Sequence, residues 1–225
     1  MKQIFLFAAL LLSLGATAQR KRISFGDESR FKIKASPLSI VDYRGANLPV
    51  GVEYTFAKKW STTLEGSVPF LKVPVFFNAS NNDRLESDIR VRAEIRKYSG
   101  EPQKTRTFMG VEAIYRQQQL TLENTSYVSD AGSYGAEFSE ISKTGVYAHC
   151  ILGIEQRISN RMSFELFGGL GAKWVSVDRE NDNIYYRGRY QGSQLFVSEK
   201  QLTGSHILPS VAFGFKMAYY LNKHK

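Results

Sequence analysis

The stretch GVYAHCILGIEQRISNRMSFELFGGLGAKWVSV, residues 145–177, decides the fold. Two runs of alternating side chains lie on either side of a tight break at Ser159, Asn160 and Arg161. In each run apolar residues occupy one parity and mostly polar or small residues the other, which is the period of a β-strand. Each run exceeds the roughly 9–11 residues that a tilted strand needs to cross a bilayer. The stretch therefore predicts an antiparallel hairpin of membrane-spanning length.

The same alternation recurs along the rest of the chain. It predicts further strands at residues 31–41, 48–56, 60–68, 88–98, 107–118 and 208–221, which with the hairpin makes eight. The breaks after the second, fourth and sixth strands are short, whereas residues 69–86, 119–142 and 178–205 form long loops, the last of which can extend its flanking strands. A transmembrane barrel has short turns at one end and longer loops at the other. The predicted fold class is all-β, an eight-stranded antiparallel transmembrane β-barrel.

The N-terminus carries an export signal. Lys2 precedes an apolar run over residues 4–14, and Ala16-Thr17-Ala18 follows as a small-x-small cleavage site. This order is that of a secretory signal peptide. We expect residues 1–18 to be removed and residues 19–225 to form the outer-membrane barrel domain, which makes the outer membrane the expected location. The single cysteine, Cys150, has no partner within the chain, so the fold cannot rely on a disulfide.

The net charge of +9 raises the question of an anionic partner. A strongly basic protein can bind nucleic acid or anionic lipid. Here the basic residues are spread among acidic ones, and the chain is expected to be exported, so we expect no nucleic-acid partner. The expected partners are outer-membrane lipid and a possible extracellular ligand or protein at the loops, with the protein itself a monomer.

Aromatic residues suggest where the membrane surfaces lie. Phe56, Trp60 and Tyr219 fall beside the predicted short turns or the C-terminus, whereas Tyr115 and Trp174 fall near the predicted long loops. Transmembrane barrels carry aromatic girdles at both interfaces. Aromatic residues also favour strands in general. The two sets are therefore candidate girdles whose levels a structure can compare.

The chain resembles the small outer-membrane β-barrels of the OmpA transmembrane-domain and OmpX type. The likeness covers most of the expected mature chain as a pattern: signal peptide, eight alternating strands, alternating loop lengths and an aromatic-rich last strand. Val50-Gly51-Val52-Glu53-Tyr54 and Phe167-Gly168-Gly169-Leu170-Gly171 are runs of the kind seen in such barrels. The resemblance implies a structural or surface-interaction role.

Charged residues on the polar parity form the candidate site. The interior of an eight-stranded barrel is only wide enough for side chains to fill it. Buried charges are tolerated when they are paired. We therefore expect a lumen plugged by a charge network of Glu53, Glu65, Arg90, Arg92, Glu94, Arg96, Glu112, Arg116, Glu155, Arg157, Glu165, Lys173 and Lys216.

Catalytic and cofactor sites have little support in the sequence. Acyl transfer commonly uses a serine, a histidine and an acid. His206 and Ser210 share a parity, and His149 stands on a polar parity, but neither arrangement matches a known motif. The three histidines and one cysteine are scattered, and no phosphate-binding glycine loop is present. We expect no enzyme, no metal and no cofactor.

Three other functions remain open. A secreted lipocalin-like barrel would bind a small ligand inside, turning its apolar parity inward. A small-solute pore would conduct, and a lipid-modifying outer-membrane enzyme would need a nucleophile with a nearby base. The favoured function is an outer-membrane barrel with a plugged lumen, whose specificity lies in the loops at residues 69–86, 119–142 and 178–205.

Overall fold

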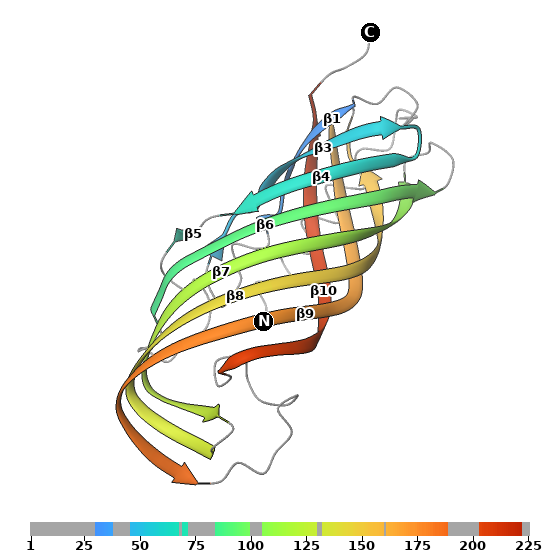
Figure 1. The fold of residues 1–225 in the computed structure, drawn as a ribbon. Helices are drawn as coiled ribbons and strands as arrows, with labels where there is room; N and C mark the ends of the chain where they lie inside the picture. The colour runs from blue at the N-terminus through green and yellow to red at the C-terminus, as the bar shows by residue number, and fades with distance from the viewer. Residues whose placement is uncertain are drawn as a thin grey trace, which may run out of the picture.

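A computed structural model describes residues 30–37, 46–67, 69–71, 84–99, 105–129, 132–159, 161–188 and 203–221. Its strands are β1 Phe31–Ala35, β2 Ala46–Asn47, β3 Val50–Ala57, β4 Trp60–Ser67, β5 Pro69–Leu71, β6 Arg84–Ser99, β7 Thr105–Ser129, β8 Gly132–Arg157, β9 Met162–Gly188 and β10 Gly204–Tyr220. Eight of them close into a barrel in the order β1-β10-β9-β8-β7-β6-β4-β3, while β2 and β5 pair separately (Figure 1). The predicted eight-stranded all-β barrel is confirmed.

Every neighbouring pair in the barrel is antiparallel, and β1 closes the ring. Ile33 of β1 lies opposite Val52 of β3 on one side and opposite Tyr219 of β10 on the other. The β3–β4 and β8–β9 connections lie at the same end of the barrel as the start of β1 and the end of β10, where Leu221 N donates to Phe31 O at 3.3 Å. We call this the turn end and the opposite end the loop end.

The two faces of the barrel wall differ in polarity. In β1 the side chains of Lys32 and Lys34 are buried while Phe31 and Ile33 are exposed. The same alternation continues around the barrel, so that charged side chains point inward and large apolar side chains point outward. On β10, for example, Phe213 is 76% exposed although Lys216 is 0% exposed.

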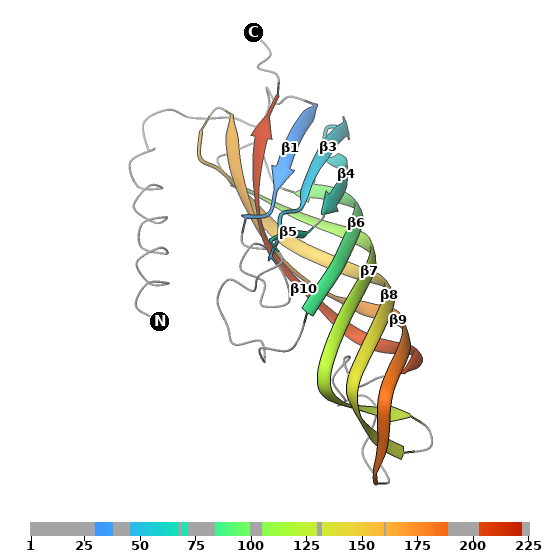
Figure 2. The ribbon, with the colours of Figure 1, turned by 90° about the vertical axis from the view of Figure 1, so that its left-hand side faces the viewer.

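Three strands extend far beyond the others. Tyr115, Val146 and Trp174 lie opposite one another on β7, β8 and β9, and beyond this row the same strands continue as what we call the arm, residues 116–129, 132–145 and 175–188. The described pairing of β6 with β7 ends at Thr121, and that of β10 with β9 ends at Val177. Figure 2 shows β7, β8 and β9 running on together past these points.

The outer face of the arm differs from that of the barrel wall. Inside the arm, Leu122, Ile141, Val175 and Val177 form a buried apolar cluster, beside buried polar side chains such as Lys143. Many of its outward side chains are instead exposed and acidic. These are Glu123, Glu140, Asp178, Glu180 and Asp182.

The arm corrects the sequence prediction of a loop over residues 119–142. β7 and β8 pair through this region, with Leu120 opposite Ile141, and the two strands end at Ser129 and Gly132. The prediction was wrong because it took the polar composition of this stretch for a loop, whereas the strands continue here with apolar residues on the inner parity. The loop predicted at residues 178–205 is likewise shorter, since β9 continues to Gly188 and β10 begins at Gly204.

The other boundaries differ less. The loop predicted at residues 69–86 includes β5 and the first residues of β6, and β1 ends at Ala35. The predicted signal peptide, residues 1–18, lies outside the described residues. In the part of the chain that is described, there is no helix of sufficient length and hydropathy to span a bilayer.

Candidate functional site

The interior of the barrel holds one continuous path of ion pairs that ends in a hydrogen-bonded histidine. The path links His149, Glu112, Arg92, Glu65, Lys216, Glu94, Arg96, Glu165, Lys34, Glu53, Lys32, Glu155 and Arg106, each paired with the next. Every N···O distance along it is at most 3.4 Å. Its carboxylates are Glu53, Glu65, Glu94, Glu112, Glu155 and Glu165, and its Lys and Arg cations are Lys32, Lys34, Arg92, Arg96, Arg106 and Lys216, six of each. The formal charges of these twelve residues cancel.

Glu53 lies at the centre of this network. One carboxylate oxygen accepts from Lys32 Nζ at 3.0 Å and from the Tyr98 hydroxyl at 2.9 Å, while the other pairs with Lys34 and lies 3.9 Å from Arg96 Nη1. The side chains of Glu53, Lys32 and Lys34 are all 0% exposed. A buried charge without a partner is costly, so the Glu53 carboxylate and the cations around it stabilise one another.

The strand period explains why these residues meet. Lys32 and Lys34 are two residues apart on β1, and Glu94 and Arg96 are two apart on β6, so each pair points to the inner face. Closure of the ring then brings strands distant in sequence together: Arg96 Nη1 donates to Glu165 Oε2 on β9 at 2.8 Å. The network thus depends on both the parity of each strand and the register of the closed barrel.

Aromatic rings fill the space between the charges. Tyr98, Phe108, Ile151 and Phe167 form a buried cluster. Glycine on the neighbouring strands makes room for the rings, since a Cβ at Gly153 would come within 2.4 Å of Phe108. The Arg96 guanidinium lies 4.1 Å from the centre of the Phe108 ring, within the range of a cation–π contact.

The charged groups of the path are largely removed from water. Charged groups at 0% exposure have lost their water, so their stability depends on the ion pairs and hydrogen bonds that replace it. Removal of one partner from such a set generally costs more than a surface ion pair contributes.

The structure brings nine of the thirteen predicted residues into the path. The other four are Arg90, Arg116, Arg157 and Lys173, which lie in other rows of the inner wall and whose place in the network stays a prediction. Arg116 lies nearer the loop end and makes two bonds to Asp88, at 2.8 and 2.5 Å. Arg157 lies at the turn end, where its guanidinium stacks over Tyr220 at 4.7 Å. Arg90 and Lys173 are partly exposed and lie in rows nearer the loop end.

Sequence analysis missed three cations of the path. Lys32 and Lys34 carried a readable signal, since both alternate with the apolar Phe31 and Ile33. Arg106 was missed because the strand was predicted to begin at residue 107, whereas β7 begins at Thr105. Arg106 bonds to Glu155 Oε2 through both Nε and Nη2, at 3.0 and 2.8 Å.

A histidine ends the path toward the loop end. His149 Nδ1 lies 2.9 Å from Glu112 Oε1, and its Nε2 lies 2.8 Å from Ser210 Oγ. His206, which the sequence placed with Ser210, instead lies 2.8 Å from the Thr203 carbonyl. Within the described ranges no group of three His, Cys, Asp or Glu side chains is arranged to hold a metal ion.

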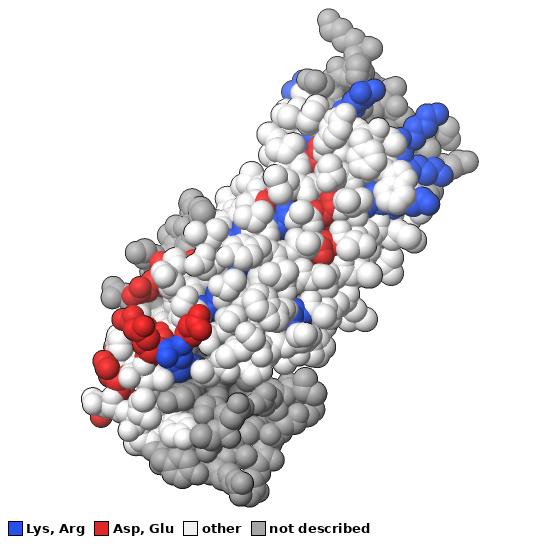
Figure 3. Space-filling model, viewed as in Figure 1, with Lys and Arg blue, Asp and Glu red and all other residues white. Residues whose placement is uncertain are grey.

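Charge on the outer surface is divided between the two ends. Exposed Lys58, Lys59, Lys97 and Arg161 lie at or near the short turns, whereas the exposed acids gather on the arm. Figure 3 shows basic groups at the turn end and acidic groups at the opposite end, with a mostly uncharged surface between them. The excess of positive charge is therefore not spread evenly over the molecule.

Comparison with known proteins finds a distant structural likeness. No family model matches the chain, and no curated protein matches it. The crystal structure of CarO2 from Acinetobacter baumannii aligns with a TM-score of 0.43 and 14% sequence identity, covering 89% of this chain and 99% of that one.

Proposed function

We propose that this protein is an outer-membrane β-barrel whose lumen is closed by its ion-pair network and whose role is structural or surface-interacting. One observation carries the proposal: the wall is apolar outside and charged inside. Ile207, Val211 and Phe213 are 75%, 75% and 76% exposed, while Glu53 and Arg96 are 0% exposed. A soluble protein would have to keep this outer surface in water.

The outer surface has the layered composition of a membrane band. Val111, Cys150, Leu170 and Val211 lie opposite one another on β7–β10 and form one apolar row. This row lies between the two levels of exposed aromatic residues. We call the outward surface between those levels the apolar band.

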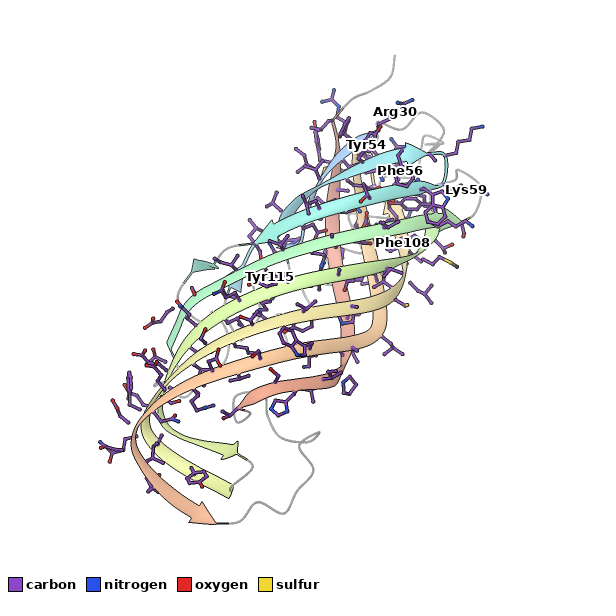
Figure 4. The ribbon with its side chains drawn as sticks, viewed as in Figure 1. Arg30, Tyr54, Phe56, Lys59, Phe108 and Tyr115 are labelled. Atoms are coloured by element: carbon purple, nitrogen blue, oxygen red, sulfur yellow. The ribbon has the colours of Figure 1, made fainter. Side chains whose placement is uncertain are left out.

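The positions of exposed aromatic residues support two membrane–water interfaces. Tyr54 and Phe56 lie near the turn end beside Arg30 and Lys59, and Tyr115 lies farther toward the loop end (Figure 4). The predicted girdle residues Phe56, Trp60, Tyr219, Tyr115 and Trp174 are all exposed, from 40% to 53%. Aromatic side chains at two levels with apolar residues between them are typical of a transmembrane barrel.

Strand length supports a barrel that projects beyond the membrane. The 27 residues of β9 extend over roughly 90 Å at a rise of about 3.3 Å per residue. A tilt of about 45° reduces this to roughly 60 Å along the membrane normal, twice the thickness of a hydrocarbon core of about 30 Å. The arm, with its acidic outer side chains, is the part we place outside the membrane.

The orientation of the two faces argues against a lipocalin-like barrel. Such a protein would bury its apolar parity and bind an apolar ligand inside. Here the interior of the barrel holds paired charges, and the space between them is occupied by aromatic rings. A secreted ligand-binding barrel is therefore the weaker candidate.

Localisation and signal cleavage are tested together. We expect the mature protein to begin at Gln19 and to partition with the outer membrane, because its outer surface requires lipid or detergent. Intact-mass analysis of the protein purified from membrane fractions checks both expectations. A mature protein that stays monomeric and soluble without detergent would contradict the proposal.

Planar-bilayer recording separates a plugged barrel from a small-solute pore. We expect no steady conductance from the wild-type protein, because the network and the rings occupy the lumen. The variant Phe108→Ala, Phe167→Ala removes two of the rings and is the matched positive control, expected to raise the frequency of transient openings. Steady currents from the wild type would favour the pore instead.

Any recognition function belongs to the loop end. The loops and the arm are carried on a rigid barrel, which is the usual setting for binding residues. We propose that outer-membrane lipid surrounds the apolar band, that the protein is a monomer resembling the OmpX type in role, and that an extracellular ligand or protein binds at the loop end. Loss of such binding on removal of residues 123–137, with the barrel still folded, would support this assignment.

A further inference from the structure

Three side chains from three strands meet on the inner wall in the order acid, histidine, serine. Glu112 Oε1 lies 2.9 Å from His149 Nδ1, and His149 Nε2 lies 2.8 Å from Ser210 Oγ. Both ring nitrogens therefore have a defined partner. Closure of the lumen involves Glu112 through its ion pair with Arg92. It does not require the hydrogen bond between His149 and Ser210.

The sheet register builds this contact. Glu112 lies opposite His149, His149 opposite Gly171, and Gly171 opposite Ser210, so the four residues form one inward row across β7, β8, β9 and β10. Gly171 has no side chain, and a Cβ there would meet the backbone of Ala148 and His149. The imidazole can therefore reach across β9 to the serine two strands away.

The hydrogen-bond partners define the tautomer of the histidine. Glu112 Oε2 also lies 3.4 Å from Arg92 Nε, so this carboxyl group accepts from the guanidinium on one side and faces His149 Nδ1 on the other. His149 Nδ1 must then carry the proton. In the neutral ring Nε2 is left to accept from the Ser210 hydroxyl, which is the relation of a general base to a nucleophile.

The acid, the histidine and the serine differ in burial, and the difference suits a reaction at the serine. Glu112 is 0% exposed and His149 is 4% exposed, whereas Ser210 is only partly buried. The acid and the base are thus held in a dry and fixed setting. The serine is the member of the three that retains access.

The inner wall between this row and the loop end holds the cation Lys173 among apolar side chains, and Arg116 beyond it is paired with the buried Asp88. Lys173 occupies the next inward position after Gly171 on β9, with Leu208 opposite it, and Arg116 and Val175 follow one row farther. Cations near a reacting carbonyl stabilise negative charge that develops on its oxygen. They also favour a substrate that carries an anionic group.

We propose that Ser210 and His149 are catalytic residues, positioned by Glu112, that hydrolyse a carboxylic ester bearing an anionic group and a short acyl chain. This activity goes beyond the structural role proposed above and does not depend on it. It also runs against the sequence-based expectation of no enzyme, because the pairing of residues 61 positions apart becomes visible only in the closed barrel.

The reaction proceeds by acyl transfer. Ser210 Oγ attacks the ester carbonyl and its proton passes to His149 Nε2, giving a tetrahedral oxyanion beside Lys173. Collapse of this intermediate breaks the ester C–O bond, and the alcohol leaves with the proton from His149. Water then attacks the acyl-serine, with His149 again taking and returning the proton, so that one ester and one water give one acid and one alcohol.

A fluorophosphonate probe tests the nucleophile directly. The probe phosphonylates an activated serine with loss of fluoride, and peptide mass analysis of folded protein in detergent should place the adduct on Ser210. Ser210→Ala should abolish labelling and His149→Gln should slow it at least a hundredfold. Ser205→Ala, an exposed serine on the same strand, is the control and should label as the wild type does. Folding of each variant is checked by heat-modifiable gel mobility.

Ester turnover tests the substrate class. We expect the mono-p-nitrophenyl ester of succinic acid to be hydrolysed at least tenfold faster than neutral p-nitrophenyl butyrate, and Lys173→Met to remove this preference. Parallel assays with a phospholipid and with its water-soluble, short-chain diacyl analogue distinguish a membrane ester from a free one. Absence of an adduct on Ser210 in folded protein, or equal labelling of wild type and His149→Gln, would overturn the proposal.

The pH–rate profile tests the positioning role of Glu112. Glu112 contacts the imidazole of His149, Arg92 contacts Glu112, the centre of the Tyr147 ring lies 6.3 Å from that of His149, and Lys173 lies opposite Tyr147. Glu112→Gln removes the charge that stabilises the imidazolium, so the midpoint of the labelling profile should move to lower pH while the maximum rate falls. A variant with lower stability but an unmoved midpoint would show that Glu112 has no such role.

Discussion

The apolar band and the arm share β7, β8 and β9 but differ in the polarity of their outer faces. In the band, Val111 and Leu152 point outward while Glu112 and Glu155 point inward and are buried. In the arm, Leu122, Ile141, Val175 and Val177 form the inward cluster, and acids such as Glu140 point outward.

The backbone does not explain this difference. The β7–β8 ladder runs from Thr105 opposite Gln156 to Ser129 opposite Gly132 without a register shift. The change lies in the surroundings: an outer face against lipid must be apolar, whereas an outer face against water can be acidic and leaves apolar side chains for the inside. In the proposed membrane orientation, the change beyond Tyr115 and Trp174 is the expected level of the membrane surface.

Breaking the buried network should give the largest loss. Glu53→Ala leaves Lys32, Lys34 and Arg96 without their shared carboxylate, and we expect a loss of about 3–5 kcal/mol in the free energy of unfolding. Glu140→Ala, on the exposed face of the arm, is the control and should change it by less than about 0.5 kcal/mol. Urea titrations in lipid vesicles measure both. Equal losses of unfolding free energy in the two variants would contradict a water-free interior.

An outward arginine should be costly in the band and harmless in the arm. Val111 and Gln117 share β7 and the outward parity, and both are exposed. We expect Val111→Arg to cost about 2–4 kcal/mol, because the charge enters hydrocarbon. Gln117→Arg lies past the Tyr115 level and should cost at most about 1 kcal/mol. The same refolding titration checks the pair, and similar costs would place the membrane boundary elsewhere.

A methyl group added to the outer face of the barrel wall should leave stability unchanged, whereas one added to the inner face should lower it. A Cβ at Gly214 would lie 2.4 Å from the Phe167 ring, whereas at Gly168 the nearest atom is 3.8 Å away. Gly214→Ala should therefore cost about 1–3 kcal/mol through overpacking. Gly168→Ala should leave the unfolding midpoint near that of the wild type. Equal midpoints for the two variants would mean that the rings are loosely packed.

Alternation predicted most of the barrel because its rule holds over the whole apolar band. It located strands such as residues 88–98 and placed Glu94 and Arg96 on the inner face, where the structure has both. The alternation rule failed in the arm. There the apolar residues change parity, and the polar composition was taken to indicate a loop. Strand period alone cannot reveal such a change, since the period stays at two on both sides of it.

The candidate site was predictable only as a set of inward residues. Parity indicates that Glu112, His149 and Ser210 face inward, but their contact depends on register across four strands and on the missing side chain of Gly171. Arg90 and Arg116 share that parity yet lie in another row. Register is a property of the closed ring and not of any one strand.

The native cysteine provides the most direct test of the apolar band. Cys150 is exposed, points outward in the row with Val111 and Leu170, and is the single cysteine of the chain. A fluorophore attached to it in urea, followed by refolding into vesicles, reports its depth through quenching by lipids brominated at different positions. Our account predicts the strongest quenching by lipids brominated deep in the acyl chain and little quenching by aqueous iodide. Strong quenching by iodide and none by brominated lipids would contradict it.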